Sequence, residues 1–154
     1  MREHALQQVR AAIGRLLTGT PGVQRVYLGR RSPIPYASLP AVNLRAIDET
    51  VSVQSIDATP IQMRACLVTL ELVAKSADDV EAVLLAVQAE VEHRIACDPL
   101  LDGLVDGMEL TGSRADDIED DDAEYLIERR ILTYETNVAT PAGAPDEIIP
   151  TERA

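Results

Sequence analysis

The fold is decided by residues 62–95, which read QMRACLVTLELVAKSADDVEAVLLAVQAEVEHRI. From Cys66 to Leu72, apolar side chains recur at every second position, which is the period of a strand with one face on a core. After Ser76 and Asp79, which mark a helix start, apolar residues recur at helical spacing: Val80, Val83, Leu84, Val87, Val91 and Ile95. Because neither element can bury its apolar face alone, we predict that the helix packs on a sheet containing the strand.

The composition predicts one domain with an aliphatic core. The chain has 154 residues, enough for a single hydrophobic core, and 46% of them are hydrophobic. Trp and Phe are absent and there are only four Tyr. The core must therefore be built mainly from Val, Leu, Ile and Ala.

The charge argues against a nucleic-acid-binding protein of the usual kind. The formal net charge is -12, and carboxylates repel phosphate backbones. An acidic surface suits a protein that must stay soluble, or a wall that DNA passes without sticking. No run approaches the roughly 20 apolar residues that span a bilayer, and the first residues predict an amphipathic helix rather than a signal peptide. We therefore expect a soluble protein with no membrane partner, not exported by the general route.

The remaining patterns predict an α/β (α+β) fold. We expect a small mixed or antiparallel sheet of four to five strands, with two main helices packed on one face. The predicted helices cover 3–17 and 80–95, and the predicted strands are 23–28, 39–45, one within 62–75, one around 108–110, and 124–137. Residues 48–60 are expected to form a hairpin arm or loop, and 114–122 a charged loop. Residues 1–138 form the predicted domain, and 139–154, with three prolines, a C-terminal tail that is extended, disordered or docked on a partner.

The densest charges lie at Asp116, Asp117, Glu119, Asp120, Asp121 and Asp122. Several carboxylates could bind a divalent cation, but a calcium loop needs acidic groups at alternate positions, a central Gly and a closing Glu. This order is absent here, so we interpret the run as a solvated hairpin loop. Asp120, Asp121 and Asp122 remain interaction candidates, because crowded like charges would tune assembly.

No catalytic, cofactor-binding or metal site is predicted. His4 and His93 lie on different predicted helices without further ligands at zinc spacing. No nucleophile motif or phosphate-binding glycine loop is present. Cys66 and Cys97 are interpreted as buried free thiols.

A second group of interaction candidates is Arg30, Arg31, Pro33, Pro35 and Tyr36. The prolines predict a rigid extended loop that cannot continue a strand. The loop is either an ordinary exposed connection or a docking loop for an acidic neighbour, including a second copy of the chain. An exposed Tyr beside prolines is an anchor that interfaces favour.

Two short motifs resemble one known family. The first is Leu39-Pro40-Ala41-Val42-Asn43-Leu44 after the proline-containing loop. The second is Asp120-Asp121-Asp122-Ala123 followed by a strand with Leu132-Thr133-Tyr134-Glu135. In this order, with the long strand, the helix and Asp98-Pro99-Leu100-Leu101 between them, they are similar to the lambda-type phage tail terminator, minor tail protein U, over residues 3–137. The chain differs by a longer arm at 48–60, an added tail after Val138, and few aromatic residues in the last strand.

The resemblance implies a structural protein and no enzyme. Such proteins form a homohexameric ring on the head-proximal end of the tail tube, stop its polymerisation, and offer a surface to head-completion or connector proteins. DNA passes through the lumen without specific binding. This implies a place in the virion, at the tail, after assembly in the host cytoplasm.

Two alternatives remain open. The first is another ring component of the neck that joins head to tail. The second is a small cytosolic α/β enzyme subunit that uses the acidic run with a metal. A ring on an electron micrograph, or a metal-dependent activity, would separate these classes.

Overall fold

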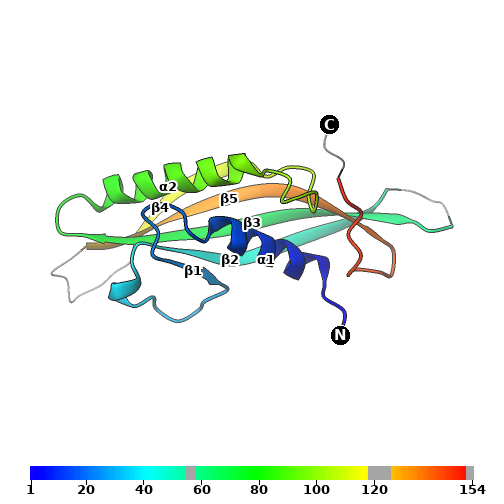
Figure 1. Cartoon of the computed structure of the whole chain (residues 1–154), viewed down its shortest axis with the longest axis horizontal. Coiled ribbons are helices and arrows are strands. Elements are labelled where there is room, and N and C mark those ends of the chain that lie inside the picture. Colours follow the sequence, from blue (N-terminus) through cyan, green and yellow to red (C-terminus); the bar gives the residue numbers. More distant parts are fainter. Residues whose placement is uncertain (55–57, 118–125, 152–154) are drawn as a thin grey trace.

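The computed structural model describes residues 1–54, 58–117 and 126–151. Within them, five strands form one sheet in the order β1-β2-β3-β5-β4 (Figure 1). Their bounds are β1 (Arg25–Leu28), β2 (Ala41–Val53), β3 (Ile61–Ser76), β4 (Glu109–Asp117) and β5 (Leu126–Pro141). The β1–β2 pair is parallel, and the other three pairs are antiparallel. The sheet is therefore mixed, as predicted.

Two long helices cover one face of this sheet, which we call the covered face (Figure 1). Helix α1 (Ala5–Leu17) packs on β1 and β2, and helix α2 (Val80–Cys97) packs on β3 and β5. The predicted α+β class, with two main helices on one face, is confirmed. No described helix combines the length and apolar character needed to cross a bilayer.

The core lies between the helices and the covered face. Cys66, Val68, Leu70 and Leu72 all point toward the helices, because alternate residues of a strand share a face. They meet the predicted stripe of α2, of which Val80, Leu84, Val87, Val91 and Ile95 are buried and Val83 is partly buried. The core is aliphatic, with Tyr134 as its one buried aromatic residue among those described.

Side chains at the helix ends explain where the helices begin. The Asp79 carboxylate accepts a hydrogen bond from the Ala82 N–H at 3.1 Å, which caps α2 as its position predicted. In α1 the imidazole of His4 accepts from the Leu6 N–H at 3.1 Å, so α1 begins at Ala5 rather than at Glu3. His4 is therefore a helix cap.

The strands around β3 are longer than the sequence predicted. Strand β2 runs on to Val53, so residues 48–53 of the predicted arm belong to β2 and pair with β3. Residues 114–117, predicted as part of a charged loop, belong to β4, because they pair with 128–131 of β5. The last strand, predicted to end at Asn137, continues to Pro141 beside the long β3. Strands β2 and β5 thus extend beyond their own apolar patterns beside the long β3, and β4 does so beside β5.

Residues 142–151 lie along the domain. The Ala5 N–H donates to the Pro145 carbonyl at 2.7 Å, and the Thr151 N–H donates to the Gly103 carbonyl at 2.8 Å. Ile148 packs against the core. Within the expected tail at 139–154, residues 139–141 are thus part of β5 and the next ten are held against α1 and the connection after α2.

The face of the sheet opposite the helices carries both polar and apolar side chains, and we call it the open face. Its β3 residues are Met63, Ala65, Leu67, Thr69, Glu71, Val73 and Lys75. One end is covered by residues 29–40, whose Leu39 forms a small apolar cluster with Ala41 and Val73.

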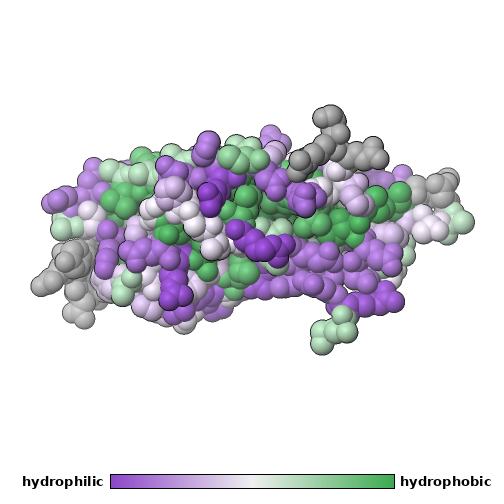
Figure 2. Space-filling view, viewed as in Figure 1, coloured by the Kyte–Doolittle hydropathy of each residue, from purple (hydrophilic) through white to green (hydrophobic). Residues whose placement is uncertain are grey.

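In the view of Figure 2, hydrophobic residues reach the surface between α1 and α2, mixed with hydrophilic ones.

Candidate interaction site

The loop candidates of the sequence come together around one hollow on the open face. Arg30, Arg31, Pro33, Pro35 and Tyr36 line a space of about 740 Å³. The sheet supplies the other side of this space, which we call the arginine hollow: Asn43 and Arg45 of β2, Glu71 and Val73 of β3, and Ile127 and Arg129 of β5. The structure thus joins the predicted loop to side chains of three strands.

Asn43 fixes the start of this loop. Its side-chain oxygen accepts from the Arg30 N–H at 3.1 Å, and its amide nitrogen donates to the Arg30 carbonyl at 3.0 Å. Asn43 itself is 2% exposed. A buried amide with both groups paired holds the loop in one position, because either group would otherwise be left without a partner.

The two arginines of the loop have different environments. The Arg30 guanidinium donates to the carbonyls of Ser32 and Pro33 at 3.2 and 2.9 Å and lies 4.8 Å from the centre of the Tyr27 ring. Arg31 is exposed and forms no ion pair or side-chain hydrogen bond with any residue that the structure describes. Arg30 therefore shapes the loop, whereas Arg31 presents its charge outward.

Tyr36 begins a short 3-10 helix, η1 (Tyr36–Ser38), at the rim of the hollow. Its side chain is 37% exposed, and the ammonium of Lys75 lies 5.2 Å from its ring centre. Pro33 and Pro35 are exposed as well. The rim is therefore a rigid surface with one large aromatic ring, which loses little conformational entropy on docking.

A row of alternating charges crosses the open face next to the hollow. Glu71 lies 3.7 Å from Arg45 and 3.4 Å from Arg129, and Arg129 also contacts Asp116 at 2.8 Å. Arg114 ends the row, 3.9 Å from Asp116. Ile131, flanked in register by Glu71 and Arg114, is 4% exposed beneath this row. The long arginine stems cover this apolar residue while their charged ends are held in line.

Within the predicted acidic run, Asp116 and Asp117 belong to β4, and Glu119 lies outside the described residues. Asp116 pairs with Arg129 in the sheet, whereas Asp120, Asp121 and Asp122 lie outside the described residues. In the described part of the chain, no three His, Cys, Asp or Glu side chains gather closely enough to hold a metal ion.

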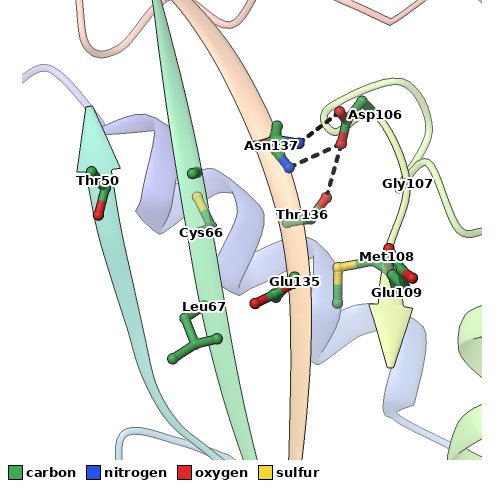
Figure 3. A pocket seen from close by; sticks show the side chains of 11 residues that line it. Thr50, Cys66, Leu67, Asp106, Gly107, Met108, Glu109, Glu135, Thr136 and Asn137 are labelled. Atoms are coloured by element: carbon green, nitrogen blue, oxygen red, sulfur yellow. Dashed lines mark hydrogen bonds between the residues drawn. The ribbon is translucent and has the colours of Figure 1, made fainter. Parts of the chain in front are cut away.

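A second hollow, of about 610 Å³, lies further along the open face (Figure 3). Its charged lining residues are Asp106, Glu109 and Glu135, with no Lys or Arg, and we call it the acidic hollow. The Asp106 carboxylate accepts from the backbone and side-chain amides of Asn137, both at 2.9 Å, as Figure 3 shows. The sequence did not indicate this hollow, because Glu135 is far in the chain from Asp106 and Glu109.

The cysteines offer no nucleophile that the geometry supports. Burial raises the pKa of the Cys66 thiol to about 11, so it keeps its proton at neutral pH. Cys97, predicted to be buried, is exposed, because it follows the last buried position of α2 on the outer side of the helix. Its sulfur lies 3.8 Å from the His93 ring. Both thiols are free, as expected.

The site can bind but has no group arranged for catalysis among the described residues. Four guanidinium groups surround one carboxylate and an apolar floor in the arginine hollow. Guanidinium groups bind carboxylates through paired hydrogen bonds. The chemistry therefore favours an acidic protein surface as its ligand.

Comparison with known proteins supports the fold. No family model matches the sequence, and no curated protein matches it. The structure is similar to a chain of the solved structure "Virion of native gene transfer agent (GTA) particle", with a TM-score of 0.50 and 19% identity. The two chains share a fold. The likeness covers 89% of this chain and 92% of the other, so it extends over nearly the whole domain of each.

Proposed function

We propose that this protein is a structural component of a phage-like virion. The observation that carries the proposal is the similarity over nearly the full length of both chains to a chain of a gene transfer agent virion. The open face is consistent with this role, because its two hollows are lined by charged side chains that a neighbouring protein can bind. No described arrangement suggests catalysis.

More finely, we propose a tail terminator: a ring that caps the tail tube, stops its polymerisation and provides the head-joining surface. The sequence motifs that resemble the lambda-type terminators support this choice. Of residues 39–44, which carry the first motif, 41–44 form the start of β2 and include Asn43, which positions the loop. The partners are then a homohexamer of the chain itself, the tail tube protein and a head-completion protein. DNA passes through the lumen.

In this role the rim at Arg31 and Tyr36 contacts either the next ring subunit or the tube. A terminator needs one surface that binds the tube and another that the tube protein cannot extend, which is how polymerisation stops. A closed ring needs a contact between two different surfaces whose rotation returns to the start. The net charge of -12 suits a ring that DNA crosses without being held.

The test is deletion of the gene from the genome that encodes it, followed by electron microscopy of the particles. The terminator role predicts tails of abnormal length without heads, and recovery when the wild-type chain is supplied from a plasmid. Tails of normal length that fail to join heads would instead identify another neck component. Complete particles in the absence of the gene would contradict both roles.

A further inference from the structure

The open face carries two hollows of opposite charge. The arginine hollow includes Glu71 and Val73 of β3, and the acidic hollow includes residues 65–67 of the same strand. Six residues of strand separate their centres, which is roughly 20 Å at about 3.3 Å per residue. One face of the molecule is therefore positive at one end and negative at the other.

The positive end is unusual for this chain. Arg30, Arg31, Arg45 and Arg129 line the arginine hollow, so four of the 14 Lys and Arg residues gather there, in a protein with 26 Asp and Glu. Glu71 is the one acidic residue in that lining. The strongest attraction available to this hollow is a surface rich in carboxylates.

The negative end has carboxylates that the described chain does not neutralise. Glu109 and Glu135 are direct partners in the β4–β5 register, and both are exposed. Like charges placed opposite each other destabilise a sheet. Neither forms an ion pair with a described residue, and beside them Leu67 is 38% exposed.

We propose that the arginine hollow docks against the acidic hollow of a second copy of this chain. Arg31 then faces Glu109 and Glu135 of the second copy, and Tyr36 packs on its Leu67. The inference rests on the ring-forming role proposed above and names the surface that the loop contacts. A second copy of the chain is the proposed partner because the two hollows have complementary charges: guanidinium groups line one and carboxylates line the other.

The two hollows are different surfaces, so this contact is heterologous. Each copy uses its arginine hollow toward one neighbour and its acidic hollow toward the other, which generates a ring if the rotation closes. Contacts between exposed charges weaken with salt, since the Debye length falls to about 3 Å at 1 M. Association should therefore be strongest at low ionic strength.

The test is a charge exchange read by sedimentation velocity over a range of concentrations at low salt. Arg31→Glu and Glu135→Arg should each weaken association roughly tenfold or more. The double variant, Arg31→Glu with Glu135→Arg, keeps the net charge at -12 and should restore association, because each new charge meets the other. Circular dichroism verifies that every variant is folded.

Matched controls carry the same charge changes on the exposed surface of the helices, at Arg15→Glu in α1 and Glu81→Arg in α2. Both should associate like the wild type. The docking is overturned if the wild type stays monomeric at every concentration, if the single variants behave like these controls, or if the double variant fails to recover.

The outcomes separate this inference from the proposed function. If the wild-type protein forms rings and the charge-exchange variants form them equally well, only the docking surface is overturned. A charge exchange that behaves as expected, combined with complete particles after deletion of the gene, overturns the tail role and leaves the docking intact.

Discussion

The two faces of the sheet use the same alternation of residues for opposite purposes. On the covered face, Val68, Leu70 and Leu72 of β3 are fully buried against the helices. On the open face, Glu71 from the same strand joins a row of ion pairs, and Leu67 remains exposed. Exposed pairs of charges add little stability, whereas buried aliphatic side chains add much. The covered face therefore holds the fold together, and the open face is available for recognition.

The largest effect should come from the covered face. Leu84→Ala removes a side chain that is 3% exposed and leaves a cavity, which should lower the free energy of unfolding by about 2–5 kcal/mol. The matched control is Leu85→Ala, the next residue of α2, whose side chain is 44% exposed. That substitution should change stability by about 0.5 kcal/mol or less. Equal effects in urea denaturation would mean that the helix does not pack on the sheet by this stripe.

An intermediate effect should come from the amide that joins the open face to its loop. Asn43→Ala leaves the N–H and carbonyl of Arg30 without their partner, which should cost about 1–3 kcal/mol. Trypsin should then cleave after Arg30 or Arg31 faster than in the wild type. Gln54→Ala, which removes an exposed amide in the arm, is the control and should change neither measurement. Unchanged cleavage in Asn43→Ala would show that the loop is held by other contacts.

The smallest effect at neutral pH should come from Cys66→Ala, because removing one buried sulfur should lower the free energy of unfolding by about 1 kcal/mol. The pKa of the Cys66 thiol is raised from 9.0 to about 11, mainly by burial and next by the charge of Glu49. The stability from the neutral thiol is therefore complete below pH 9 and is lost as the pH rises through 11. Between pH 8 and 10.5, Tm should fall less in Cys66→Ala than in the wild type. The exposed thiol is the control: Cys97→Ala should follow the wild type, and identical falls in all three proteins would refute the pKa shift.

Sequence patterns were sufficient for the covered face and insufficient for the open one. The stripe of α2 and the alternation of β3 are local, so they could be read from adjacent residues, as was the Asp79 cap. Asn43 lies within the predicted strand 39–45, so its place in the sheet followed from the sequence. Its partner, Arg30, could not be identified, because that contact depends on how the loop folds back over the sheet.

The row of ion pairs was missed for a topological reason. Arg129 contacts both Glu71 and Asp116 because β5 lies between β3 and β4 in the sheet, although β4 lies between β3 and β5 in the chain. The sequence analysis likewise did not distinguish Arg30 from Arg31. In the structure Arg30 donates to two backbone carbonyls, whereas Arg31 is exposed. Local periodicity carries no information on such contacts between distant segments.

The contact between Ala5 and Pro145 also sets an order of events during synthesis. The first turn of α1 is translated early, but the carbonyl that accepts its N–H is added 140 residues later, the difference between 145 and 5. At about 5–20 residues per second, the helix waits on the order of 10 s for that partner. A chain cut short before Pro145 would contain all five strands but lack this hydrogen bond. Translation past this residue therefore completes the packing at the start of α1.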